Sequence, residues 1–138
     1  MTPAALNPPA FIMHVSATEA RALNIPRLLD AIGEVESWND DESIGALGER
    51  GRYQIRPALW NEYTSMPIAL ARFRVNSATV ATRILKHWET ILQARGCPQS
   101  IMPTVMVTWW QCGPHGTPSE KKRDSIQRVM NLYEEAKY

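Results

Sequence analysis

Glu36 is the residue of this chain whose placement most favours acid–base chemistry. It lies four residues after Ile32 and seven after Leu29, so on a helix it shares a face with these apolar side chains. Partial burial and the negative end of a helix dipole both raise the pKa of a carboxyl group. The sequence therefore predicts a carboxyl that is protonated near neutral pH, the state in which a general acid works.

Another interpretation of Glu36 is structural. A carboxylate on a core-facing helix edge is costly unless something uses or pairs it, and Arg52 or Arg56 could pair it. Glu34 is expected to project toward water instead. Helix geometry alone leaves the catalytic and the structural interpretations open.

Metal and phosphate chemistry find less support. Cys112 and His115 have the spacing of two metal ligands, but no second pair at zinc-site spacing follows, so we expect no metal and no cofactor. The glycines between Gly45 and Gly51 lack the Lys-Ser/Thr ending of a phosphate loop. Cys97 and Cys112 are the two cysteines, and the sequence leaves open whether they pair.

The elements that must position Glu36 are predicted to be helices. Pro26 fits the first turn of a helix that ends near Ser37. A loop rich in Asn, Asp and Gly then runs to Gly51, with a short β-hairpin as an alternative, and leads into residues 53–55. The buried stripe of the helix is predicted to be Leu28, Leu29, Ile32 and Val35.

Further helices are expected after this loop. Short ones should begin at Pro57 and Pro67, and a long one capped by Asn76 or Ser77 should stop at Gly96. An apolar helix should run from Pro103 to about Gln111. The last helix should start at a capping box in which Thr117 is the N-cap and Pro118 is in the first turn. We therefore expect a mainly α, multi-helix domain with a small loop or β-hairpin lobe.

Length and charge set the limits of this interpretation. The 138 residues fit one domain, which we place at 16–138 after an irregular arm at 1–15. A capping box at Ser16 and Glu19 should open a short helix. The net charge of +1 disfavours a nucleic-acid partner, and the basic run at 121–123 is interpreted as a solvated helix face. No segment is apolar enough to predict membrane insertion.

Three short motifs occur in order along the chain: Glu36-Ser37, then residues 51–55 with the sequence Gly-Arg-Tyr-Gln-Ile, then residues 110–114 with the sequence Trp-Gln-Cys-Gly-Pro. They resemble the three ordered motifs of the soluble lytic transglycosylase and goose-type lysozyme superfamily, over about residues 28–114. The resemblance implies a lysozyme-like fold. It also implies an enzyme that cleaves the β-1,4 bond between N-acetylmuramic acid and N-acetylglucosamine.

Roles follow from the resemblance position by position. Glu36 matches the catalytic glutamate, and Ser37 matches a serine that steadies it or touches substrate. Gln54 matches a glutamine whose amide contacts the sugar or the region of the acid. Tyr53 stands where an apolar residue usually lines the cleft. These positions imply one catalytic residue and several substrate contacts.

The third motif departs from the family pattern. Trp110 and Gln111 match an aromatic-Asn pair beside the acid, but Gln111 replaces the asparagine and Cys112 replaces a small residue. The longer amide side chain puts its contact with Glu36 or the substrate in doubt. Trp38, which follows Ser37, could be a platform for a sugar ring or a lid over the core.

The chemistry implied by the resemblance needs one carboxyl group. As a lytic transglycosylase, the enzyme would use Glu36 first as acid and then as base while a 1,6-anhydro ring closes. A hydrolase is the alternative, and an inverting one needs a second carboxylate to hold the water. Candidates in the adjoining loop are Asp40, Asp41, Glu42 and Glu49. A non-catalytic glycan-binding module of the same fold is a further alternative.

The expected partner is a peptidoglycan glycan strand, and we expect a monomer. Residues 1–13 carry prolines and no basic segment followed by an apolar one, so they do not have the pattern of a signal peptide. A substrate in the bacterial cell wall then requires another route. A phage-type lysin released through a pore, a secretion-system effector and a fragment of a larger chain would each explain it.

Overall fold

The computed structural model describes residues 22–135, and their regular structure is helical. The prediction of a mainly α fold is therefore confirmed. Within these residues no helix combines the length and the apolar character that a bilayer span requires. The predicted arm at 1–15 and the capping box at Ser16 and Glu19 lie outside the described part. The helices are α2 (Ile25–Ser37), α3 (Pro57–Tyr63), the 3-10 helix η1 (Ile68–Arg72), α4 (Arg74–Ala94), α5 (Met102–Cys112) and α6 (Glu120–Glu135).

The chain divides into two compact units. One is Ile25–Leu85, here called the Glu36 unit, and the other comprises described residues 22–24 and 86–135, here called the Trp110 unit. The boundary falls within α4, between Leu85 and Lys86. A single domain over 16–138 stays a prediction.

In the Glu36 unit, α2 begins and ends close to its predicted limits. Its apolar stripe at Leu28, Leu29 and Ile32 is buried, whereas Val35 near its end is only half-buried. Residues 38–56 form an irregular loop with two isolated antiparallel bridges, Ile44 to Arg50 and Arg50 to Ile55. The lobe after α2 is therefore a loop pinned by two bridges, without a paired strand in the described residues.

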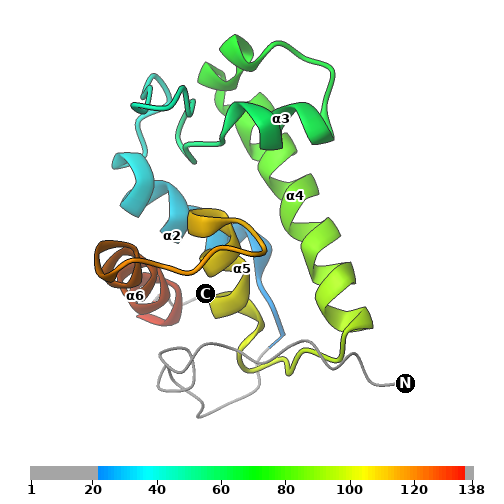
Figure 1. Ribbon diagram of the computed structural model, residues 1–138. Coiled ribbons are helices and arrows are strands. Elements are labelled where there is room, and N and C mark those ends of the chain that lie inside the picture. Colours follow the sequence, from blue (N-terminus) through cyan, green and yellow to red (C-terminus); the bar gives the residue numbers. More distant parts are fainter. Residues whose placement is uncertain (1–21, 136–138) are drawn as a thin grey trace. The chain divides into compact units, whose positions relative to one another are not determined.

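Two short helices follow this loop, as Pro57 and Pro67 predict. Pro57 opens α3, and Pro67 directly precedes η1. The buried Trp60 of α3 donates its indole N–H to the carbonyl oxygen of Met66 at 2.7 Å, which ties α3 to the segment entering η1. Figure 1 shows the two short helices next to each other near the start of α4.

Helix α4 begins at Arg74, three or four residues earlier than a cap at Asn76 or Ser77 predicts. The side chains of Asn76 and Ser77 do not cap it, because they donate backward to the carbonyl oxygens of Leu70 and Ala71 in η1. The turn at Phe73 starts the helix instead, and its carbonyl accepts the N–H groups of both residues. The predicted cap was therefore wrong, since these polar side chains join two helices rather than start one.

The far end of α4 agrees with the prediction. Gly96 has a φ of +74°, and its N–H donates to the carbonyl of Gln93 while that of Cys97 donates to the carbonyl of Leu92. This is the pattern of a Schellman motif, in which a glycine adopts the left-handed conformation after the last helical residue.

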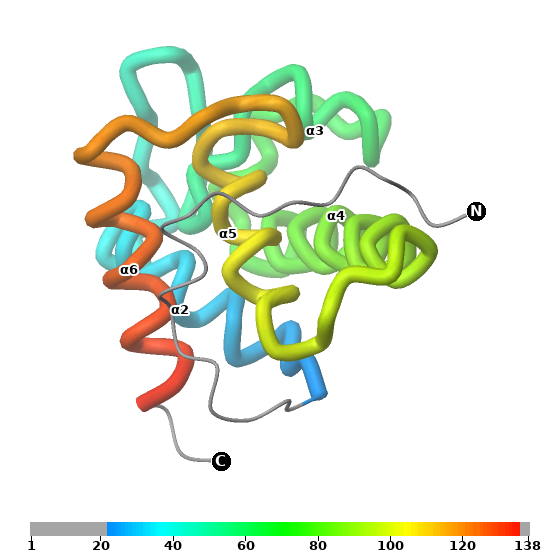
Figure 2. Tube along the Cα trace, turned by 60° about the horizontal axis from the view of Figure 1, so that its bottom comes forward, coloured from blue at the N-terminus to red at the C-terminus, as the bar shows by residue number. Residues whose placement is uncertain are grey.

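In the Trp110 unit, α5 and α6 pack against each other. All nine residues of α5 from Met102 to Trp110 are buried, so this helix has no solvent face over that length. The chain then turns back through 113–119 to α6, as Figure 2 shows. On α6, the predicted stripe is buried: Ile126, Val129, Met130 and Tyr133.

The N-cap of α6 was predicted two residues too early, at Thr117. The helix begins at Glu120, and the Ser119 hydroxyl accepts the N–H of Lys122 at 3.2 Å. Ser119 is therefore the N-cap, and Thr117 is not. Two members of the basic run are also engaged: Lys122 Nζ donates to the carbonyl of Gln111, and Arg123 donates to that of Pro118. All three residues of the run are exposed, so the prediction of a solvated helix face is confirmed.

Candidate functional site

Glu36 lies in the last turn of α2, as the sequence predicts. It is half-buried, and α2 has no basic residue in its last turn. Glu34, which was expected to face water, is half-buried as well. The negative end of the α2 dipole therefore adjoins Glu36 without a neighbouring cation on the same helix end.

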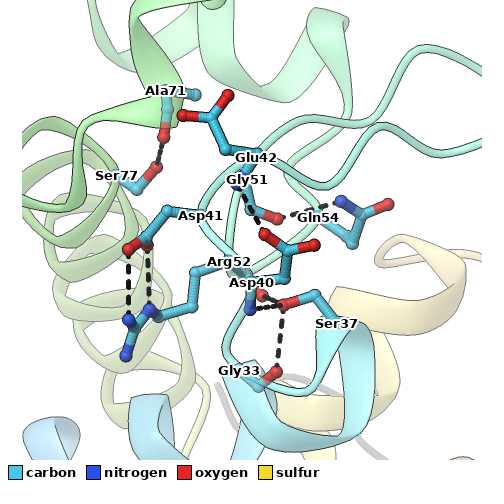
Figure 3. Close-up of polar contacts among 10 residues, drawn as sticks. All are labelled: Gly33, Ser37, Asp40, Asp41, Glu42, Gly51, Arg52, Gln54, Ala71 and Ser77. Carbon is cyan, nitrogen blue, oxygen red and sulfur yellow. Dashed lines mark hydrogen bonds and ion pairs between the residues drawn. The ribbon is translucent and has the colours of Figure 1, made fainter.

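Ser37 ties the end of α2 to the second motif. Its hydroxyl donates to the carbonyl oxygen of Arg52 at 2.6 Å and accepts the backbone N–H of Asp40 at 3.0 Å (Figure 3). The hydroxyl is thus committed on both its donor and its acceptor side. Ser37 joins the end of α2, next to Glu36, to the backbone at Asp40 and Arg52, and this is how it can steady the acid.

Arg52 is engaged with the loop after α2. Its Nε and Nη2 atoms donate to the two carboxylate oxygens of Asp41 at 2.9 and 3.2 Å, the bidentate geometry favoured by guanidinium and carboxylate. The hydrogen bond to Asp41 raises the pKa of Arg52, against the opposing effect of burial. The alternative in which Arg52 serves as the partner of Glu36 loses support, since this fork faces Asp41.

The side-chain amide of Gln54 makes its hydrogen bonds inside the loop. Its backbone φ is +51°, and its Nε2 donates to the carbonyl oxygens of Gly51 at 2.9 Å and Ser43 at 3.2 Å. A Cβ at Gly45 would lie 2.7 Å from its Oε1. Both amide hydrogens are used inside the loop, so Gln54 can offer a sugar only its amide oxygen.

Tyr53 is 4% exposed. Burial raises the pKa of its phenol above the ordinary value, the largest of several influences. Only the small exposed part of this side chain could touch a sugar. In this position Tyr53 chiefly fills the interior of the Glu36 unit.

Two glycines make these approaches possible, and the sequence analysis did not single out the first of them, Gly33. A Cβ at Gly33 would lie 2.6 Å from Oδ1 of Asn39, 3.0 Å from Cγ of Arg52 and 3.3 Å from Cε1 of Tyr53, so three side chains closely cover α2 at this glycine. Gly51 has a φ of +79°, and its Cβ would lie 2.7 Å from the carbonyl oxygen of Ala71. A glycine inside a helix pattern, as at Gly33, is the signal that indicates such a close approach.

Trp38 is not a lid over the core. It is 78% exposed, and its φ is +58°, an uncommon conformation for a bulky residue. Its N–H donates to Glu34 and that of Asn39 donates to Gly33, so the wide turn after α2 is fixed by backbone hydrogen bonds. The turn presents a large flat ring to solvent two residues after Glu36.

The four candidates for a second catalytic carboxylate differ in their hydrogen-bond and ion-pair partners. Asp41 pairs with Arg52, Asp40 accepts the N–H of Glu42, and Glu49 accepts the N–H of Leu47 at 2.7 Å. Within residues 22–135 the exposed carboxylate of Glu42 has no hydrogen-bond partner. Three of the four thus stabilise the loop, and Glu42 is the one left available for a water molecule.

Trp110 and Gln111 belong to the Trp110 unit. The Trp110 ring is buried and meets Trp88 edge to face, with centroids 6.0 Å apart, and Trp109 meets Trp88 in the same way at 5.6 Å. Gln111 is half-buried, and its carbonyl accepts Lys122 Nζ at 2.9 Å. Their position beside Glu36 stays a prediction.

Cofactor chemistry has few candidates in the described part of the chain. Residues 22–135 contain no cluster of three or more His, Cys, Asp or Glu side chains able to hold a metal ion. Cys97 and Cys112 are thiols rather than halves of a disulfide, and burial raises the pKa of Cys97.

No protein-family model, curated protein or solved structure was found to match this chain.

Proposed function

We propose that the chain is a lysozyme-like enzyme that cleaves the β-1,4 bond between N-acetylmuramic acid and N-acetylglucosamine in peptidoglycan, with Glu36 as general acid and base. Its proposed mode is that of a lytic transglycosylase. It would act as a monomer on glycan strands at the bacterial cell wall, after delivery by a phage-type or secretion-system route.

One observation carries this proposal. The Ser37 hydroxyl donates to the Arg52 carbonyl at 2.6 Å, so two motifs that are separate in sequence meet beside Glu36. A coincidental match of short motifs does not require such a contact. The exposed ring of Trp38 adds a surface of the kind on which sugar faces stack.

The proposed reaction begins with protonated Glu36. Its proton goes to the glycosidic oxygen as the bond to C1 of the muramyl residue breaks through an oxocarbenium-like state. The carboxylate then takes the proton of the muramyl 6-hydroxyl, whose oxygen attacks C1 and closes the 1,6-anhydro ring. The proton count balances, and Glu36 ends the cycle protonated.

Clearing of purified cell walls by the native chain and by Glu36→Gln tests this role. Loss of the proton donor should lower the rate at least about a hundredfold. Glu34→Gln is the matched control, because it removes the same charge from the same helix and should keep most of the rate. No clearing by the native chain, together with binding that survives Glu36→Gln, would instead identify a non-catalytic glycan-binding module.

Hydrolysis is the second candidate, and the availability of Glu42 favours it. An inverting hydrolase places a second carboxylate where it can activate water. Mass spectrometry of the products separates the two reactions, since a transglycosylase leaves anhydro ends and a hydrolase leaves reducing ends. If reducing ends dominate, Glu42→Gln should abolish them while Asp40→Asn should not.

A further inference from the structure

A small surface that is both apolar and basic lies where η1 meets α4. Phe73 is 48% exposed and Val75 is 77% exposed, and Leu70 beside them is also exposed. Arg72 and Arg74 alternate with them along the chain and are exposed too. We call these five residues the Phe73 surface. They occupy the last turn of η1 and the first turn of α4, so the chain itself keeps them together.

These apolar side chains are not part of the buried face of α4. The inward face of α4 in this unit is formed by five buried residues: Ser77, Val80, Ala81, Ile84 and Leu85. Phe73 and Val75 lie outside that face and expose apolar surface to the solvent. The guanidinium carbon of Arg72 lies 4.8 Å from the centroid of the Phe73 ring, a cation–π contact at the surface.

Charge is divided unevenly in the Glu36 unit. Residues 25–62 carry eight carboxylates and four arginines, whereas residues 63–85 carry no carboxylate and three arginines. Helix α4 also has no acidic residue in its first turn, so the positive end of its dipole adds to the two arginines of the Phe73 surface. The five residues of the Phe73 surface therefore carry two positive charges and no negative one.

We propose that the Phe73 surface docks the protein onto an anionic phospholipid membrane. Phosphate headgroups complement Arg72 and Arg74, and the boundary between headgroups and acyl chains accepts the three apolar side chains. A soluble polyanion would satisfy the arginines but would gain nothing from Phe73, Val75 and Leu70. The contact is peripheral and places side chains in the interface without a spanning helix.

Vesicle sedimentation with the full chain tests the docking. The native protein should bind vesicles that contain phosphatidylglycerol, bind neutral phosphatidylcholine vesicles far less, and be released by salt. Arg72→Gln with Arg74→Gln should lower the partition coefficient about twenty-fivefold, from about fivefold per arginine. Phe73→Ser with Val75→Ser should lower it about tenfold.

Controls separate lipid from other anions. Leu47→Ser, at an exposed leucine in the loop, should leave vesicle binding unchanged, and inorganic polyphosphate should bind the native chain and Phe73→Ser with Val75→Ser equally. Circular dichroism checks folding, and Val75→Ser alone replaces the double variant if that does not fold. The proposal is wrong if the native chain does not bind anionic vesicles, or if the serine variants bind them as tightly as the native chain does. The vesicles contain no glycan, so the outcome is independent of the proposed cleavage.

Discussion

The two regions that carry the candidate residues are held by different forces. Around Ser37, Gly51 and Gln54, backbone carbonyls and side-chain donors form directional hydrogen bonds, and a glycine leaves space for a carbonyl. Around Trp110, the candidate residues sit on a helix whose core is apolar and whose rings pack edge to face on Trp88. The first region depends on residue identity, and the second depends mainly on volume.

This difference predicts where substitutions are tolerated. At Gly51 and Gln54, a changed residue would clash with backbone or lose a specific hydrogen bond. Gln111 and Cys112, in contrast, lie at the half-buried end of α5. Packed regions tolerate substitutions of suitable size more readily than hydrogen-bonded ones do.

The largest effect on stability is expected from the packed region. Trp88→Ala removes a buried ring that both Trp109 and Trp110 contact, and it should lower the free energy of unfolding by about 3–5 kcal/mol. Urea denaturation measures this change. Trp38→Ala is the matched control: its ring is mostly exposed, and its loss should change stability by less than about 0.5 kcal/mol. Equal losses would contradict the assignment of Trp88 to the core.

The next effect belongs to the hydrogen-bonded region. A Cβ at Gly51 would lie 2.7 Å from the Ala71 carbonyl and 2.8 Å from the Ser77 hydroxyl. Gly51→Ala should therefore cost about 2–4 kcal/mol, from backbone strain and overlap together. Gly48→Ala tests strain alone, because its φ is +86° and its nearest contact is an ordinary 3.5 Å to Pro57. A thermal unfolding series in which the two variants melt together would disprove the close approach.

The sequence predicted the helices more accurately than it predicted the contacts between residues. Helical spacing located α2, α5 and α6, and prolines located α3 and η1, because these signals are local. The start of α4 was missed, since Asn76 and Ser77 bond to η1 rather than to their own helix. The same polar residue can cap its own helix or donate a hydrogen bond to another helix, and only the fold shows which of the two it does.

The candidate site shows the same division. The place of Glu36 at the end of α2 follows from periodicity alone. That Gln54 turns its amide into the loop and that Asp41 holds Arg52 could not be predicted, because a flexible polar side chain chooses among several partners that sequence does not rank. The exposure of Trp38 could not be predicted either, because a Trp after a helix is equally compatible with a lid over the core and with a platform for a sugar ring.

A smaller effect is expected from Ser37→Ala. The change removes the donor to the Arg52 carbonyl and the acceptor of the Asp40 N–H, and the free energy of unfolding should fall by about 1–2 kcal/mol. Ser119→Ala removes one N-cap bond to Lys122 in the other unit and should cost about 1 kcal/mol. Cell-wall clearing separates them further: it should fall in Ser37→Ala and stay unchanged in Ser119→Ala.

The smallest effect is expected from alkaline pH, which probes both units at once. Burial raises the pKa of Tyr53 in the Glu36 unit and of Cys97 in the Trp110 unit. The folded protein then keeps protons that the unfolded chain has lost, so stability is fully present below the ordinary pKa and falls as pH rises through the raised one. The fall should begin above about pH 8.5 for Cys97 and above about pH 10 for Tyr53.

Urea denaturation under reducing conditions across this range measures the two contributions separately. Cys97→Ala should remove the loss of stability at the lower end of this pH range and keep the loss at the higher end. Tyr53→Phe should do the opposite. Because each group reports on one unit, the two variants show whether the hydrogen-bonded region and the packed region both exclude water from an ionisable side chain. A profile of stability against pH that neither substitution changes would mean that these two groups are solvated in the folded protein, and the burial on which the comparison depends would be wrong.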